Sequence, residues 1–445
     1  NEFSKLLTRY GSTAINAYTT LDETVYHSEC APQYIAQWCQ LNSECFINPV
    51  FRLFQGELET VYEEKNRGED NFGVQLMEHL QGQVFKGSDY EFPVIGSTEN
   101  LKNPRLSDME AFYQKYYVAN NMALILCGKF NEKDVLPLLE KTFGRIHNGP
   151  IPQRQPINLA DFSPEKTIKV KIPFPLIKVS ALLFRGPIPR NHDYTALQIA
   201  MRLLSNSNES GLIDSLVSHH SIMYGMAASE QISMMREVGL IGLAAVPNLP
   251  FGSKRKAERL LWQQINKLKE GDFSTESFEA AKTEYQKMQE QQLENLQTRI
   301  TLMTNCYLNG MNWNDYLHQI SMLATLQKDD VVAACRHYFN QHYLLLHKKF
   351  GKYKKDKISK PPYKAVETNN ENSQSDYAKA LEKTPTPTLT PQFVSLGKEV
   401  TTRHLGQQAD LYVTENPQNN IFHLRLSWLQ NHVNQPTHSM SDLFS

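Results

Sequence analysis

Four glutamates on one helical segment are the residues whose type and spacing could do chemistry. Residues 50–67 read VFRLFQGELETVYEEKNR, an amphipathic pattern without proline that predicts a helix. At about 100° per residue, Glu57 and Glu64 fall within the apolar arc, whereas Glu59 and Glu63 face the opposite side. A carboxylate that faces a core needs a salt bridge, hydrogen bonds or a metal ion. We therefore expect Glu57 and Glu64 to be the more buried pair.

Two interpretations of this pair are open from the helix alone. In the first, both carboxylates lie at the edge of the apolar face and reach solvent or pair with a lysine or arginine, which is the commoner situation. In the second, they belong to a functional site. The helix by itself favours the first interpretation.

The composition is that of a globular protein with more than one domain. A chain of 445 residues exceeds the usual single core, so we expect two or three domains. Its 46 basic residues nearly cancel its 47 acidic ones, which gives no support for binding to nucleic acid or anionic membranes through bulk charge. No long apolar run predicts a membrane span. The chain starts with Asn and shows no signal peptide, so the N-terminus does not reveal the compartment.

Cysteine does not carry the chemistry. The six cysteines are too sparse for a disulfide scaffold, and none forms a C-x-x-C pair. Cys127 lies in the apolar segment MALILCG, which predicts a strand with a small buried thiol.

Two segments about 220 residues apart share one pattern. Residues 107–130 and 329–351 each open with acidic residues, continue as an amphipathic helix to an aromatic pair, and enter an apolar strand after a polar turn. A second repeat precedes each of them: a helix ended by Gly11 leads into strand 16–27, and a helix before Gly225 leads into a strand-like stretch. These repeats predict a duplicated unit of roughly 200 residues.

The expected domain organisation follows from these repeats and from composition. It comprises a first unit at 1–150, a second homologous unit at 165–350, a linker at 351–391 and the start of a third unit at 392–445. The linker is polar and carries a lysine run at 352–357, which we interpret as a solvated feature. In the last segment, residues 416–420 predict a hairpin turn.

The order of motifs resembles the first half of the insulinase/pitrilysin family of zinc metallopeptidases, which also holds the mitochondrial processing peptidases. The motifs that carry the resemblance are NEFSKLL, NAYTTLDETVY, ELETVYEE, FPVIGSTENL and FYQKYYVANNMALILCGKF. It covers residues 1 to about 350, and the last segment resembles the start of the family's second half. The resemblance implies an α/β (α+β) fold of two homologous units, each an antiparallel sheet backed by helices. Two such halves close around an unfolded peptide in the family.

The resemblance also implies a zinc-dependent metalloendopeptidase acting on peptides or small unfolded proteins. The family binds zinc through two histidines of a His-x-x-Glu-His helix and a downstream glutamate, and the glutamate of the first motif is the general base. The family's downstream pattern falls on Glu57 and Glu64. Glu64 is thereby implied as a zinc ligand, and Glu57 as a carboxylate that orients a ligand.

The strand residues Asn16, Ala17, Tyr18 and Thr19 match the family's substrate-binding edge. A peptide adds there as an extra strand, so that backbone groups rather than side chains bind it. The alternative is an ordinary strand inside a sheet.

One departure from the family pattern decides what this chain can do by itself. It contains no His-x-x-Glu-His and no His-Glu-x-x-His, since His27 is followed by Ser-Glu-Cys. The resemblance places the zinc helix ahead of Asn1. We therefore expect one zinc ligand of three, no catalytic residue within this chain, and no stoichiometric zinc in it.

Two functional hypotheses remain. The first is part of an active zinc endopeptidase whose missing helix supplies His, Glu and His. The second is a non-catalytic scaffold or partner subunit of the same family. Retention of both Glu57 and Glu64 favours the first. The expected partners are a peptide or unfolded-protein substrate and a C-terminal half or homologous subunit, and the family gives export to the periplasm as an expectation.

Overall fold

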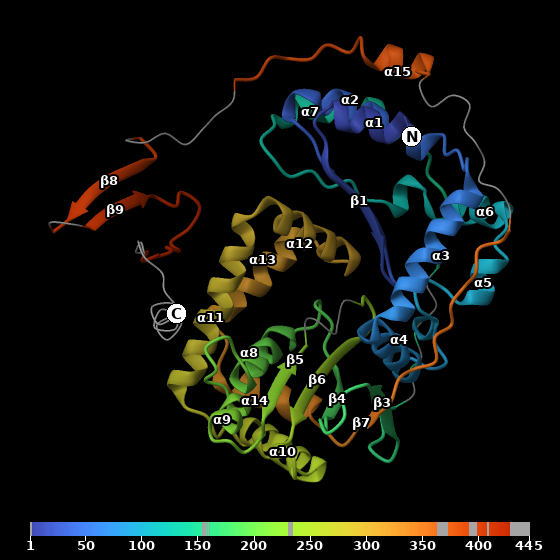
Figure 1. The fold of residues 1–445 in the computed structure, drawn as a ribbon. Helices are drawn as coiled ribbons and strands as arrows, with labels where there is room; N and C mark the ends of the chain where they lie inside the picture. Colours follow the sequence, from blue (N-terminus) through green and yellow to red (C-terminus); the bar gives the residue numbers. More distant parts are fainter. Residues whose placement is uncertain are drawn as a thin grey trace, which may run out of the picture.

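The computed structural model describes residues 2–153, 157, 159, 161–229, 235–362, 373–390, 398–406 and 409–427. Two lobes face each other around a central space, and the chain after the second lobe runs back along the outside of the first (Figure 1). The arrangement is a mixed α/β fold, which confirms the predicted fold class.

The first lobe is mainly helical and contains one hairpin. Its elements are α1 (Glu2–Arg9), β1 (Thr13–Thr19), β2 (Thr24–Glu29), α2 (Ile35–Ile47), α3 (Phe54–Asp70), α4 (Phe72–Val84), α5 (Thr98–Lys102), α6 (Leu106–Tyr116) and α7 (Glu132–Thr142).

The second lobe is built on a five-stranded sheet. Its elements are β3 (Thr167–Ile172), β4 (Ser180–Gly186), α8 (Tyr194–Leu204), α9 (Leu212–Ser218), β5 (Tyr224–Ala228), β6 (Gly239–Val246), α10 (Lys254–Glu270), α11 (Thr275–Glu294), α12 (Leu296–Leu308), α13 (Trp313–Ser321), α14 (Lys328–Tyr338) and β7 (Tyr343–Phe350). The strand order is β3-β7-β4-β6-β5.

The sheet of the second lobe is mixed rather than purely antiparallel. Strands β3 and β7 run parallel, whereas the pairs β7–β4, β4–β6 and β6–β5 are antiparallel. The expectation of an antiparallel sheet is therefore wrong for one pair. The chain between β3 and β7 includes seven helices, α8 to α14, which is ample for the long crossover that a parallel pair requires.

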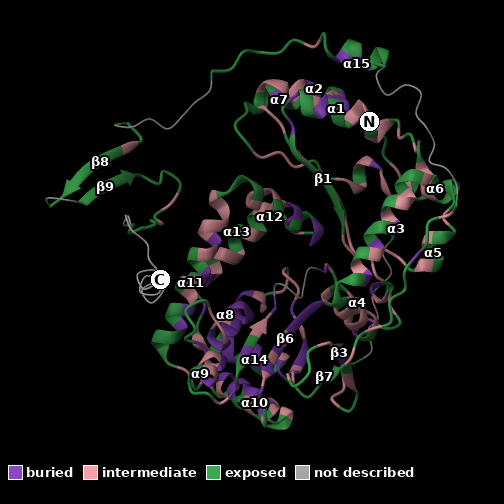
Figure 2. Cartoon of the chain, viewed as in Figure 1, coloured by how far each residue is buried: buried purple, intermediate pink, exposed green. Residues whose placement is uncertain are grey.

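The two faces of this sheet are covered by different lobes. Helices α8, α10 and α14 cover one face with a core that includes Phe184, Leu261 and Phe339. The opposite face packs against the end of α4, where Val84 and Phe85 join the strand residues. Figure 2 shows that buried residues concentrate in the second lobe. Burial of apolar side chains thus stabilises the second lobe, and it also stabilises the contact between the second lobe and the first.

The first lobe forms less sheet than the sequence predicts. The stretch 16–27 is a hairpin that turns between Thr19 and Thr24. Residues 122–127 form no strand, and Cys127 is half-buried. The predicted strand and the predicted buried thiol of this segment are therefore both wrong. A strand requires a hydrogen-bonded neighbour, and this segment does not join the two-stranded hairpin β1–β2 in the described chain.

The repeated order of helix and extended segment is visible in both lobes. Helix α6 is followed by residues 122–127, which form no strand, and α14 is followed by β7. Likewise α1 precedes β1, and α9 precedes β5. Duplication of one unit stays a prediction, as do the domain limits.

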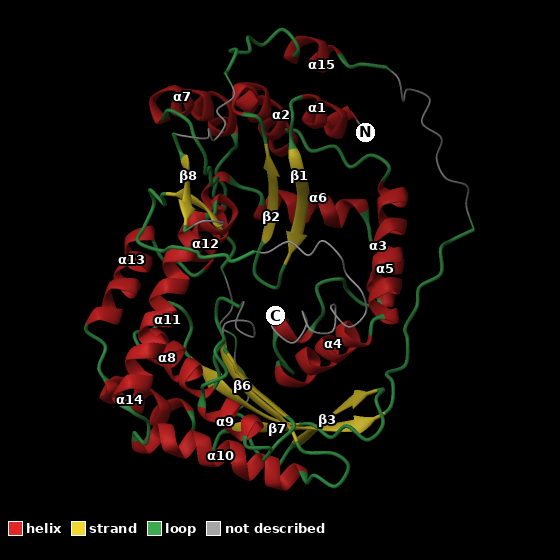
Figure 3. Cartoon of the chain, turned by 60° about the vertical axis from the view of Figure 1, so that its left-hand side comes forward, coloured by secondary structure: helices red, strands yellow, loops and turns green. Residues whose placement is uncertain are grey.

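The remaining described segments are α15 (Asp376–Leu381), β8 (Val400–Leu405) and β9 (Ala409–Thr414). Helix α15 packs on the first lobe, where Leu381 joins a cluster with Leu7 of α1 and Leu41 of α2 (Figure 3). The hairpin expected around 416–420 is wrong: β9 pairs with β8, which precedes it, and residues 421–427 form no strand. No helix in the described ranges has the length and hydropathy for crossing a membrane.

Candidate functional site

Helix α3 carries the four glutamates, and its buried face differs from the predicted one. The helix begins at Phe54, after Leu53 with a φ of 54°. Its buried side chains are Tyr62, Lys65 and Glu69, which share one face by their spacing of three and four residues. The Tyr62 hydroxyl donates to the Leu101 carbonyl at 3.0 Å, which fixes this face against α5.

The predicted burial order of the glutamates is wrong. Glu57 and Glu64 are both exposed, whereas Glu59 is half-buried. Because Glu64 follows Tyr62 by two residues, it lies about 200° around the helix from the buried face. The apolar arc of residues 50–67 includes Leu53, but this residue is outside the helix and 47% exposed.

Glu57 and Glu64 still differ from the other two glutamates in one respect. Glu59 accepts a hydrogen bond from Gln55 at 3.2 Å, and Glu63 pairs with Lys360 at 3.2 Å. Neither Glu57 nor Glu64 has a hydrogen-bond or ion-pair partner among the described residues. Seven residues apart, they lie within about 20° of each other around the helix, so one face presents two unpaired carboxylates.

The inward carboxylate of α3 is Glu69, which sequence reasoning missed. Its Oε1 lies 3.3 Å from Lys65 Nζ, and both side chains are less than a tenth exposed. Its Oε2 accepts from Gln75 Nε2 at 3.1 Å and from the backbone N–H of Asp356 at 3.0 Å. A buried ion pair needs such additional donors to offset the loss of water. Lys65 and Glu69 are spaced i, i+4 and lie on the same helix face as Tyr62. This spacing is the sequence feature that could have predicted the buried pair.

Residues 351–362, here called the strap, connect the second lobe to α3. The Asn66 side chain donates to the Ile358 carbonyl and accepts from its N–H, both at 2.9 Å. Lys355 and Lys357 pair with Asp70. The interpretation of the lysine run as a solvated linker is therefore incomplete, because two of its lysines contact the first lobe. Figure 1 shows the strap passing α4, α5 and α3.

Strand β1 presents an open backbone edge. Each of its seven residues is exposed, and β2 is its one neighbour in the described chain. Residues Asn16 to Thr19 pair regularly with His27 to Thr24, whereas the register is irregular between Thr13 and Asn16. Ala14 in this irregular part has a φ of 49°. The Ala17 N–H donates to the Asn16 side-chain Oδ1 at 2.9 Å. The other N–H and C=O groups along the outer side of β1 have no strand partner in the described chain, so another strand can add there.

An aromatic cluster anchors the hairpin to the first lobe. The Tyr26 and Tyr117 hydroxyls lie 2.8 Å apart, and the rings of Tyr113 and Tyr117 stack with centroids 4.3 Å apart. Burial raises the pKa of Tyr113 to about 12, so this hydroxyl stays protonated at neutral pH. The cluster is structural: it fixes the position of β2 and thereby that of β1.

A zinc site is not complete in the described chain. No group of three or more His, Cys, Asp or Glu side chains that could hold a metal ion occurs among the described residues. The carboxylates of Glu57 and Glu64 do not by themselves fit a tetrahedral zinc ion, which takes three or four protein ligands.

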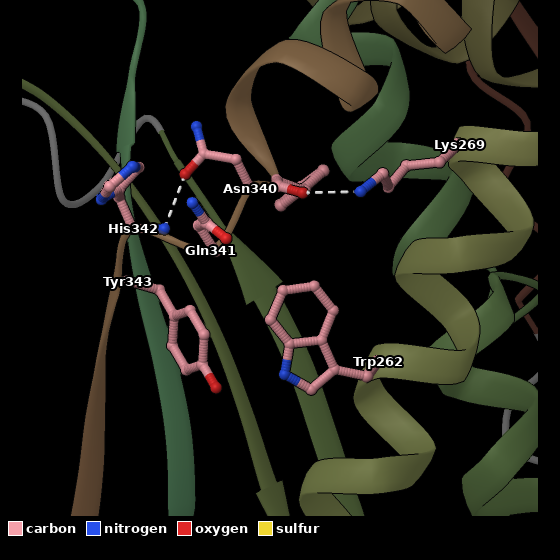
Figure 4. Close-up of a pocket in the computed structure, with 7 residues that line it drawn as sticks. Trp262, Lys269, Asn340, Gln341, His342 and Tyr343 are labelled. Atoms are coloured by element: carbon pink, nitrogen blue, oxygen red, sulfur yellow. Dashed lines mark hydrogen bonds between the residues drawn. The ribbon is translucent and has the colours of Figure 1, made fainter. Parts of the chain in front are cut away.

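Two hollows lie in or against the second lobe. A shallow one of about 570 Å³ lies between α10 and the turn before β7, where Trp262 faces Tyr343 with ring centroids 5.2 Å apart (Figure 4). None of the predicted site residues lines it. The other, of about 230 Å³, lies where the turn after β1 meets α11, α12 and α13.

The fold is that of known peptidase structures. A protease from Helicobacter pylori superposes with a TM-score of 0.66 at 20% identity, over 78% of this chain and 84% of that one. The two-lobed α/β arrangement is therefore a fold that this chain shares with that structure.

Residues 105–285 match the family described as Peptidase M16 inactive domain. The chain is homologous to the β subunit of mitochondrial processing peptidase from Caenorhabditis elegans, with 23% identity over 192 residues, 43% of this chain and 41% of that protein. It is also 25% identical over 201 residues to core protein I of the ubiquinol-cytochrome-c reductase complex from Euglena gracilis, covering 44% and 40%. The resemblance to the insulinase/pitrilysin family is confirmed. The chain spans about two fifths of the length of these relatives.

Proposed function

We propose that this chain is the peptide-binding part of a zinc-dependent endopeptidase that acts on peptides or small unfolded proteins. The observation that carries the proposal is the open edge of β1, where Asn16, Ala17, Tyr18 and Thr19 are exposed and regularly paired on one side only. An extended peptide would complete this edge through backbone hydrogen bonds.

Glu64 is proposed as the zinc ligand that this chain contributes, and Glu57 as the carboxylate that orients a ligand. Their lack of partners in the described chain supports this assignment, because a ligand must be free to bind. The remaining ligands and the general base would come from the His-x-x-Glu-His helix that the family resemblance places ahead of Asn1. A second half or a homologous subunit would close over the peptide.

A non-catalytic scaffold or partner subunit is the second candidate. It is favoured by the match of residues 105–285 to an inactive domain and by the similarity to a core protein of a respiratory complex. Such a protein could bind extended peptides or a partner subunit without cleaving them.

Cleavage of an unstructured fluorogenic peptide by the full-length gene product tests both candidates. We expect hydrolysis that is lost by at least about 100-fold in Glu64→Gln, together with most of the zinc, and a milder loss of about 10- to 100-fold in Glu57→Gln. Glu63→Gln is the matched control on the same helix and should leave the rate unchanged. Hydrolysis and zinc content unaffected by Glu64→Gln would refute the ligand assignment. Peptide binding without any hydrolysis would establish the non-catalytic candidate.

A further inference from the structure

The cavity of about 230 Å³ lies between the two lobes at the end of β1. Strand β1 ends at Thr19, and the next residue, Thr20, lines the cavity together with Glu23. The opposite wall comes from α8, α11, α12, α13 and the loops beside them, and includes Tyr194, Tyr285, Gln289, Asn305, Asn309 and Gln319. A peptide paired with β1 that continued beyond Thr19 would therefore reach the cavity.

The wall of this cavity is rich in hydrogen-bond acceptors and has one charge. Among the described residues, Glu23 is the one acidic side chain that lines it, and no lysine, arginine or histidine does so. The other polar groups are mainly amides and tyrosine hydroxyls. A cavity with one carboxylate and no basic group favours a ligand that is positively charged and donates hydrogen bonds.

Two of the acceptors have no partner among the described residues. Asn309 is 7% exposed, and its Oδ1 accepts no hydrogen bond, although its Nδ2 donates to the Asn305 carbonyl at 2.8 Å. Glu23 is half-buried, and its carboxylate makes no hydrogen bond or ion pair in the described chain. Gln289 differs, since its Oε1 accepts from the Tyr316 hydroxyl at 2.8 Å. A buried acceptor without a donor is unfavourable, so both groups would gain from a bound donor.

The charged groups around Glu23 do not supply that donor. The Asp22 carboxylate accepts from the Tyr90 hydroxyl at 2.7 Å and from the backbone N–H of Arg236 at 3.0 Å. It adds a second negative charge beside Glu23. Arg190, the basic residue that reaches Asn309, donates to its backbone carbonyl at 3.3 Å and pairs with Glu237 at 3.2 Å. Burial, and after it the charge of Asp22, raises the pKa of Glu23, which a bound cation would oppose.

We propose that this cavity binds the cationic side chain of a lysine or arginine in a peptide that lies along β1. Glu23 would pair with the cation, and Asn309 Oδ1 would accept one of its N–H groups. The Tyr285 ring in the wall already stacks with the Arg202 guanidinium, 4.3 Å from the ring centroid, so the proposal depends on Glu23 and Asn309. This inference rests on the proposed function and adds a side-chain preference to binding that is otherwise made by the backbone.

The test compares extended peptides that carry arginine or citrulline at one position, which is moved along the sequence. Citrulline keeps the shape and removes the charge. Fluorescence anisotropy with the full-length protein should show about tenfold tighter binding of arginine at one position. Glu23→Gln should remove this difference and leave the affinity for the citrulline peptide unchanged. Glu29→Gln, at the far end of the same hairpin, is the matched control and should keep the difference.

Each outcome decides the inference. Equal affinity of the unmutated protein for the arginine and citrulline peptides at every position would refute the proposed cation site. This comparison does not depend on the folding of a variant. If the citrulline peptide were still bound and cleaved, the proposed function would stand without the pocket. If no peptide bound at all, both the proposed function and the proposed cation site would be refuted. A preference for arginine that survives Glu23→Gln would place the cation site elsewhere.

Discussion

Asn66 holds the backbone of Ile358 through both ends of its side-chain amide, with two hydrogen bonds of 2.9 Å. The two residues are 292 positions apart. Asn66 lies two residues after Glu64 on α3, and Ile358 lies in the strap that leaves β7. The orientation of the helix that carries the candidate ligand is therefore coupled to the chain that leaves the second lobe.

Asn66→Ala should release the strap. The change leaves the N–H and C=O groups of Ile358, a residue that is 3% exposed, without partners, which should cost about 2 kcal/mol of unfolding free energy. Limited proteolysis should then cut within residues 351–362 much faster than in the unmutated protein. Asn120→Ala is the control, because Asn120 makes the same pair of bonds with Gly149, away from the strap. Unchanged cleavage in Asn66→Ala would show that the other contacts of the strap, such as the Asp356–Glu69 hydrogen bond and the ion pairs of Asp70, hold it without Asn66.

Glu69→Gln should destabilise the protein far more than Asp70→Asn. Glu69 is the counter-ion of the buried Lys65, so its neutralisation leaves a buried charge and should cost about 3 kcal/mol. Asp70 pairs with Lys355 and Lys357 at the surface, where salt and water weaken such pairs, so its loss should have little effect. Urea denaturation of the two variants measures the difference. Equal midpoints would show that the Lys65–Glu69 pair contributes nothing beyond a surface pair.

The sequence predicted the local elements better than the partners of their side chains. The helices expected at the start of segments 107–130 and 329–351 correspond to α6 and α14. The orientation of α3 could not be predicted, because its buried face is set by the strap and by α5 at Leu101, which are remote in sequence. A buried Lys65–Glu69 pair has the appearance of a solvated pair in the sequence, since only tertiary contacts exclude the water.

Peptide binding along β1 should depend on alternate backbone N–H groups of the peptide. An added strand directs every second N–H toward its neighbour. Peptides N-methylated at alternate positions in one phase should therefore bind at least about tenfold more weakly, whereas the other phase should bind normally. Isothermal titration of the two series measures this. Equal weakening in both phases would mean that the peptide does not bind as a strand.

Glu23→Gln should stabilise the protein without peptide, and only above acidic pH. The raised pKa means that folding favours the protonated carboxyl. Its contribution is therefore fully present below the ordinary carboxyl pKa and is lost as the pH rises through the raised value in the folded protein. The melting temperature of Glu23→Gln should exceed that of the unmutated protein at pH 7.5, and the two should converge at pH 4. A constant difference at both pH values would show that Glu23 is ionised freely in the folded state.

The 445-residue chain by itself should retain no stoichiometric zinc after exhaustive dialysis. Its described part offers no group of three ligands, and a lone carboxylate binds zinc weakly. Metal analysis by mass spectrometry checks this, with the full-length gene product measured alongside. A tightly bound ion in the shorter chain would require ligands from residues outside the described ranges.

The open edge of β1 also affects how the protein behaves in concentrated solution. Every copy carries the same open strand edge, so two molecules can join through their β1 strands. The irregular backbone between Thr13 and Asn16 shortens the regular edge to a few residues and weakens this association. A peptide bound along β1 would occupy the same edge. Such a peptide should therefore keep the protein monomeric, and a concentrated preparation without it should dimerise first.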